Sequence, residues 1–206
     1  ETVRRWYDAR ADYEWIRLFQ DGYHQLEYLI TTHFLERYLP KTGLVLDAGG
    51  GPGRYTIELA KKGYEVVLLD LSPKCLAIAR SEISKAGVGN RVKIVRGSVT
   101  DLSRFGNGFF DAVLCLGPLS HLIERSEREE AAIELVRVAK EKAPLFVSVS
   151  NLYGAFSVAL GWHPEDLTDP SHEELFSKGI HRAHYRNLKE AKRSASETDA
   201  YFFHPA

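Results

Sequence analysis

The stretch of residues 45–55 constrains the fold of this chain more than any other segment. An apolar run there meets an acid, Asp47, and three glycines then alternate with other residues before a helical pattern begins. Glycine has no Cβ, so Gly49, Gly51 and Gly53 permit a sharp turn and a close approach of the backbone to a ligand. We therefore predict a strand, a ligand-binding turn and a helix. A tight strand-to-helix turn without a ligand is the alternative.

The spacing of these glycines argues against a pyrophosphate ligand. A dinucleotide loop has the pattern Gly-x-Gly-x-x-Gly, whose third glycine lets the helix pack closely on the strand. Arg54 or Thr56 stands at that third position here, depending on the glycine from which the count begins. Pro52 also removes one backbone N–H that a pyrophosphate would need. A ligand without phosphates fits the loop better.

The acid at the end of the next apolar run, residues 65–70, suggests a ribose. Asp70 follows Gly51 by 19 residues, close to the offset of about 20 at which a carboxylate meets ribose hydroxyls. Taken alone, Asp70 is better explained as an acid at a helix N-terminus beside Ser72. Its offset from the glycine loop favours the ribose interpretation.

Strand-like and helix-like segments alternate along the rest of the chain, which predicts an α/β fold with a doubly wound, mainly parallel sheet. The capping box Ser126 to Glu129 predicts the start of a helix that runs to about residue 142. Asp47, Asp70, Ser98 and Gly117 would all lie at the carboxyl ends of strands, where such sheets bind ligands. The predicted strands are the run from residue 45 and residues 65–70, 92–97, 110–116 and 145–150, and the other predicted helices lie around residues 26–35, 54–62 and 72–83.

The motif acid-x-Gly-x-Gly-x-Gly, followed by an acid after the second strand, resembles the class I (Rossmann-like) S-adenosylmethionine-dependent methyltransferases. The resemblance runs from about Tyr38 to Ser150. It implies that the glycine loop passes the methionine part of S-adenosylmethionine, that Asp70 holds the ribose hydroxyls and that Leu71 packs on adenine. The cofactor-binding residues expected from the resemblance are Asp47, Ala48, Gly49, Gly51, Gly53, Asp70, Leu71, Ser98, Val99, Leu116 and Gly117.

Two further positions follow from the same resemblance. Family members often carry an acid after the third strand, but Ser98 stands there, with Val99 offering a backbone N–H and Asp101 as a substitute acid. After the fourth strand, the segment from Leu116 to Leu122 looks like the Leu-Gly-Pro-Leu-x-His-Leu of many members. His121 in this segment is the candidate general base, and a histidine that caps the following turn is the alternative.

The segments that flank the alternating pattern suggest a lid. We expect one domain over residues 1–206, with a helical N-terminal cap at 1–40, a cofactor-binding core at 41–150 and a substrate or lid region at 151–206. Residues 1–25 and 151–206 are rich in aromatic side chains, and ordinary surface helices are the alternative. The aromatic residues expected to line the acceptor site or cover the methionine end of the cofactor are Trp6, Tyr7, Tyr13, Tyr153 and Trp162.

These features predict transfer of a methyl group to a small-molecule acceptor by in-line displacement. An RNA or protein methyltransferase and a non-catalytic S-adenosylmethionine-binding protein are alternatives, and a nicotinamide-dependent oxidoreductase on a related sheet is a third. Nucleic acid is an improbable partner, because a net charge of −1 leaves no overall basic character. The oligomeric state is left open.

Composition restricts the class of protein to which this chain can belong. A chain of 206 residues with 44% hydrophobic and 27% charged residues is typical of a globular domain, and we expect a cytoplasmic enzyme without a membrane segment. Two cysteines form no disulfide framework, and without Cys-x-x-Cys or His-Glu-x-x-His spacing we expect no metal site. The sequence contains no methionine. We therefore expect methionines to be missing from it. The family fold adds a helix and an antiparallel strand pair after the fifth strand, yet the chain stops at Ala206, so we also expect the C-terminal strands to be missing.

Overall fold

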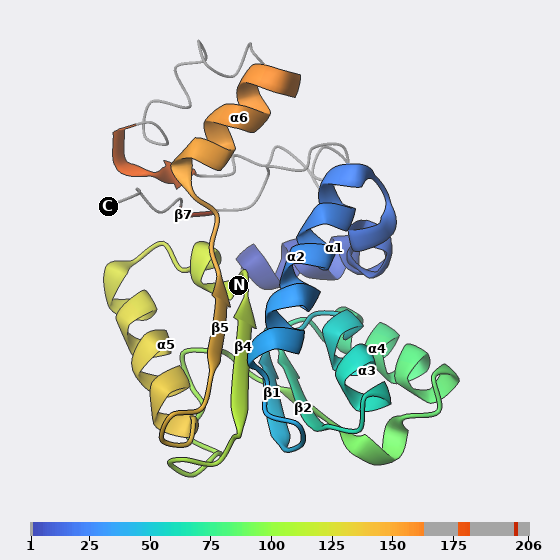
Figure 1. Ribbon diagram of the computed structural model, residues 1–206. Helices are drawn as coiled ribbons and strands as arrows, with labels where there is room; N and C mark the ends of the chain where they lie inside the picture. Colours follow the sequence, from blue (N-terminus) through green and yellow to red (C-terminus); the bar gives the residue numbers. More distant parts are fainter. Residues whose placement is uncertain (1, 163–176, 182–199, 202–206) are drawn as a thin grey trace.

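The computed structural model describes residues 2–162, 177–181 and 200–201, and its centre is a five-stranded parallel sheet in the order β3-β2-β1-β4-β5 (Figure 1). The α/β fold predicted from the sequence is therefore confirmed. All four pairings within this sheet are parallel, and Asp47 of β1 lies opposite Leu68 of β2 and Leu114 of β4. The strands are β1 (Leu44–Ala48), β2 (Glu65–Asp70), β3 (Val92–Arg96), β4 (Ala112–Leu116) and β5 (Leu145–Ser148).

Each face of the sheet carries its own hydrophobic cluster, because successive side chains of a strand point to opposite faces. On one face, β1, β2 and β4 pack against α2 (Gly22–Tyr38), α3 (Arg54–Lys61) and α4 (Pro73–Lys85). On the other face, the same strands pack against α5 (Arg125–Val138) and the loop that follows β3. The central strands are thus buried on both sides, as their continuous apolar runs require.

An N-terminal helix lies across one end of this sheet. Figure 1 shows α1 (Thr2–Ile16) above the tips of the strands, and the short 3₁₀ helix η1 (Arg17–Phe19) links it to α2. Asp21 begins α2, because its side chain accepts a hydrogen bond from the His24 N–H at 2.9 Å. Parallel strands end at the same edge of a sheet, so α1 covers the carboxyl ends of the strands, where we expect the ligand.

The remaining elements are short. Two 3₁₀ helices, η2 (Gly89–Arg91) and η3 (Pro118–His121), precede β3 and follow β4. After β5 the chain forms α6 (Leu152–Trp162), and the two-residue strands β6 (Ile180–His181) and β7 (Ala200–Tyr201) pair antiparallel. Within the described part of the chain, no helix is long and apolar enough to cross a membrane.

The predicted elements are present, with one error in how a helix begins. Ser72 caps α4 as predicted, since its hydroxyl accepts from the Cys75 N–H at 3.0 Å. The capping box at residues 126–129 is wrong, because α5 starts at Arg125 and its N-cap, Glu124, makes no side-chain capping bond. Helix α5 also ends at Val138, short of the predicted residue 142.

Candidate functional site

The loop between β1 and α3 is shaped by three glycines with positive φ. Gly49, Gly51 and Gly53 have φ of 77°, 55° and 84°, in the left-handed region that other residues rarely adopt. The Gly49 N–H donates to the Leu69 carbonyl at 2.7 Å, which lays the loop over the end of β2. Gly53 is the N-cap of α3. The predicted strand, turn and helix are therefore formed.

Space around these glycines differs from one position to the next. A Cβ at Gly49 would collide with Pro118 of η3. A Cβ at Gly50, a residue that the sequence pattern did not single out, would lie 2.5 Å from both Asp47 Cγ and Leu68 Cδ1. A Cβ at Gly51 would meet nothing within 4 Å. Gly51 is thus the position where the loop borders open space, while Gly49 and Gly50 are needed for packing.

Asp47 lies beneath the loop and is only 2% exposed. Its Oδ2 accepts a hydrogen bond from the buried Thr56 hydroxyl at 2.6 Å. Burial raises the pKa of Asp47 to about 6, and the Thr56 hydrogen bond partly offsets that rise. The neighbouring Ala48 is fully buried. These two expected site residues therefore support the loop from below.

Asp70 lies at the end of β2 and receives two backbone N–H groups. Its Oδ2 accepts from Gly51 at 2.9 Å and its Oδ1 accepts from Ser72 at 2.8 Å. Burial raises the pKa of Asp70 above its usual value. A carboxylate has about four lone-pair sites, so each oxygen keeps one for a further donor. Leu71 follows with 41% of its surface exposed, unusual for a leucine beside a buried strand.

The ends of β3 and β4 complete the edge. Ser98 hydrogen-bonds to the Thr100 hydroxyl at 2.7 Å, and Val99 is buried. Asp101, the candidate substitute acid, is exposed, and its carboxylate accepts from the Ser103 N–H at 3.1 Å. After β4, Leu116 is half-buried and Gly117 turns the chain with φ of 107° into η3.

Hydrogen bonds join α1 to the segments that follow three of the strands. The Tyr7 hydroxyl lies 2.8 Å from His121 Nε2, after β4. The Asp8 carboxylate accepts from the Ser72 hydroxyl at 2.6 Å, after β2. After β1, Arg54 donates to the Trp15 carbonyl at 2.7 Å. The sequence suggested Tyr7 by its position, but no pattern pointed to the Asp8 contact, because it joins residues far apart in the chain.

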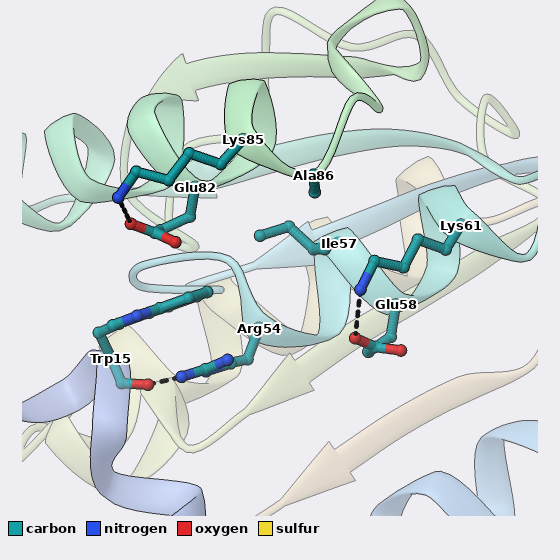
Figure 2. Close-up of a pocket in the computed structure, with 8 residues that line it drawn as sticks. All are labelled: Trp15, Arg54, Ile57, Glu58, Lys61, Glu82, Lys85 and Ala86. Atoms are coloured by element: carbon teal, nitrogen blue, oxygen red, sulfur yellow. Dashed lines mark hydrogen bonds and ion pairs between the residues drawn. The ribbon is translucent and has the colours of Figure 1, made fainter.

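Two cavities in the described part of the molecule lie away from this edge. Figure 2 shows one of about 230 Å³ between α3 and α4, where the Arg54 guanidinium stacks on the Trp15 ring at 3.3 Å. The other, of about 540 Å³, lies between α4 and β3. Neither is lined by any of the expected site residues. This agrees with a strand edge that α1 covers.

Comparison with known proteins identifies the family. Residues 45–142 match a methyltransferase domain. The chain is 29% identical over 195 residues to a ubiquinone biosynthesis O-methyltransferase from Xanthomonas axonopodis, a match that covers 94% of this chain and 73% of that protein. It is 36% identical over 124 residues to a glycine/sarcosine N-methyltransferase from Parasynechococcus marenigrum, covering 57% and 42%.

A solved structure supports the same assignment at the level of the fold. The chain superimposes on an S-adenosylmethionine-dependent methyltransferase from Methanosarcina mazei with a TM-score of 0.65 and 22% identity, covering 83% of this chain and 77% of that one. The chain spans about half the length of several of the curated relatives that it matches. Sheet order, glycine loop and these matches agree, and residues 45–142 belong to the class I S-adenosylmethionine-dependent methyltransferases, whose cofactor and methyl donor is S-adenosylmethionine.

Proposed function

We propose that this chain binds S-adenosylmethionine at the carboxyl edge of β1 and β2 and transfers its methyl group to a small-molecule acceptor. The observation that carries the proposal is the contact between the Gly51 N–H and Asp70 Oδ2 beside open space at Gly51. It brings the glycine loop and the acid of β2 into one site. The residues fit the cofactor, because Asp70 keeps free lone pairs for ribose hydroxyls and Leu71 offers exposed apolar surface for adenine.

The chain's own contribution to catalysis is binding, orientation and exclusion of water. When bound, S-adenosylmethionine supplies an already activated methyl group, so no nucleophilic residue of the protein is required. Alignment of an acceptor can contribute roughly 7 to 11 kcal/mol. The position of α1 over the strand ends suits it to exclude water. His121 is the proposed general base for a hydroxyl or protonated amine acceptor.

Three observations support a small acceptor. The two relatives described above carry names that refer to ubiquinone biosynthesis and to glycine and sarcosine. Helix α1 covers the strand ends, to which Tyr7, Asp8 and Trp15 connect it, and so leaves less room there for a macromolecular acceptor. The net charge of −1 supplies no overall attraction for a polynucleotide. An RNA or protein acceptor and cofactor binding without methyl transfer remain as outcomes of the test.

The test combines calorimetry with a transfer assay. S-adenosylhomocysteine should bind the wild-type protein, and Asp70→Ala should weaken that binding by roughly 10- to 100-fold, since hydrogen bonds to a charged group contribute about 1.5–3 kcal/mol each. Glu65→Ala is the comparator, because this exposed carboxylate lies at the other end of β2, where it pairs with Arg91 at 2.9 Å. Label from methyl-labelled cofactor should then appear in a small-molecule pool and not in RNA or protein. Unchanged affinity in folded Asp70→Ala would refute the cofactor site.

A further inference from the structure

The contact between Tyr7 of α1 and His121 of η3 joins two elements that are far apart in the sequence. The Tyr7 hydroxyl lies 2.8 Å from His121 Nε2, and the two rings meet edge to face at 5.4 Å and 90°. The Trp6 and Tyr7 rings also meet edge to face, with ring centroids 4.8 Å apart. The phenol and the imidazole therefore hold a defined mutual orientation.

The direction of this hydrogen bond follows from the state of the phenol. Burial raises the pKa of Tyr7 well above its usual value, so the hydroxyl keeps its proton at neutral pH. Within the described residues, His121 Nε2 is the hydroxyl's only hydrogen-bonding partner. If Nε2 carried a proton it would have to donate, and the phenol O–H would then lack an acceptor. An unsatisfied buried donor costs about 1–3 kcal/mol, which favours Nε2 as the acceptor.

We propose that Tyr7 is a positioning residue that holds neutral His121 in the tautomer with its proton on Nδ1 and its lone pair on Nε2. The nitrogen that carries the proton in a neutral imidazole is set by the hydrogen bond at the other nitrogen. The basic atom of His121 is then Nε2, on the side that faces α1. The use of this arrangement rests on the proposed function: the hydroxyl or ammonium of the methyl acceptor replaces the Tyr7 hydroxyl at Nε2 and gives its proton to the lone pair that Tyr7 had held in place.

Histidine ring nitrogen NMR on the full-length chain tests the proposal without any methyl acceptor. At a pH where His121 is neutral, its Nε2 should show the shift of an unprotonated nitrogen and its Nδ1 that of a protonated one. The His121 signals are identified as those that disappear in His121→Gln. Tyr7→Phe keeps the ring contact and removes the hydroxyl, so the fraction of His121 with a proton on Nε2 should rise several-fold.

Tyr13→Phe is the matched control, because it removes a hydroxyl from the same helix whose contact in the described structure is with Gln20. It should leave the His121 tautomer unchanged. A proton on Nε2 in the wild-type protein would overturn the proposal, whether or not Tyr7→Phe folds. An unchanged tautomer in folded Tyr7→Phe would also overturn it. Absence of methyl transfer with the expected tautomer would refute the proposed function alone.

Discussion

Two carboxylates at neighbouring strand ends have different surroundings. Asp47 is sealed under the glycine loop with the Thr56 hydroxyl, whereas Asp70 receives two backbone N–H groups at the rim of open space. In sequence both read as acids that end an apolar strand, and the family resemblance put both in the cofactor site. Burial separates them: Asp47 is suited to fixing the loop and Asp70 to binding a ligand.

Asp47 should make stability depend on pH. Its folded pKa of about 6 lies above its usual value of 3.8, so between these values the folded state binds more protons than the unfolded state. The contribution of Asp47 to the free energy of unfolding must therefore fall as pH rises from about 4 to about 6. Asp47→Asn lacks this titration and should gain on the wild type by up to about 3 kcal/mol over that range.

The measurement is denaturant unfolding of both proteins at several pH values from about 4 to 7. The difference between the two free energies matters, since other carboxyls, such as Asp111 and Glu134, have lowered pKa values and titrate in both proteins. A difference that does not change with pH would contradict the raised pKa of Asp47.

Substitutions at Gly51 should show whether an added side chain blocks ligand binding or only strains the backbone. Valine there would be strained at φ of 55° as well as filling the open space, so alanine is the better probe. Gly51→Ala and Gly87→Ala should each lose about 1–2 kcal/mol of stability, because both glycines have positive φ and no atom within 4 Å of an added Cβ. Only Gly51→Ala should weaken S-adenosylhomocysteine binding, by tenfold or more in calorimetry. Equal affinities would show that the loop is only a turn.

Among the elements, α1 should act as a cap that opens separately from the sheet. Among its polar anchors, Asp8 accepts from the Ser72 hydroxyl at 2.6 Å and from the Lys74 N–H at 3.4 Å, and it pairs with Arg4 at 2.6 Å. Asp8→Asn should weaken the cap by roughly 1–2 kcal/mol, since it removes a charge-assisted contact. Amide hydrogen exchange of α1 should then become about tenfold faster while that of β1 and β4 is unchanged.

The exposed Asp12 lies on the same helix, and Asp12→Asn should leave the exchange of α1 at its wild-type rate. If Asp8→Asn accelerated exchange equally throughout the sheet, α1 and the core would unfold as one unit and the cap would not open by itself.

The elements themselves were largely readable from the sequence, because their signals are local. Strand β2 has the predicted bounds, and Ser72 with Pro73 fixed the start of α4. The capping box failed because α5 begins one residue before Ser126, and Arg128 of its first turn instead donates to the Ile123 carbonyl at 2.6 Å. Ile123 lies before the four residues of the pattern, so the pattern alone did not indicate this contact.

The candidate site shows the same difference between local features, which the sequence indicates, and contacts between distant residues, which it does not. The contact between the glycine loop and Asp70 was predictable from spacing, since a turn and the next strand end are fixed by chain geometry, and the role of these residues in cofactor binding stays a prediction. The partners of α1 were not predictable, because the pairing of Asp8 with Ser72 depends on how a helix docks on a sheet. The expected aromatic Trp162 cannot be compared in this way, as its side chain lies outside the described residues, and Tyr153 is largely exposed.

On the scale of the whole molecule, cofactor binding should raise thermal stability. S-adenosylhomocysteine at about 100 times its dissociation constant should add about 2.7 kcal/mol if it binds only the folded chain. For a chain of this size, each kcal/mol moves the midpoint by about 2–4 °C, so a rise of about 5–10 °C is expected in a thermal melt. NAD at the same concentration should leave the midpoint unchanged. A rise with NAD would favour the nicotinamide alternative.

The packing of Pro118 against Gly49 has an evolutionary consequence. A side chain at position 49 would strike the proline ring, and the two residues belong to the loops after β1 and β4. A substitution at position 49 is therefore tolerated only together with a change at position 118. Related sequences that acquire a larger residue at position 49 must also lose the proline at position 118, so the two columns should change together as the family diverges.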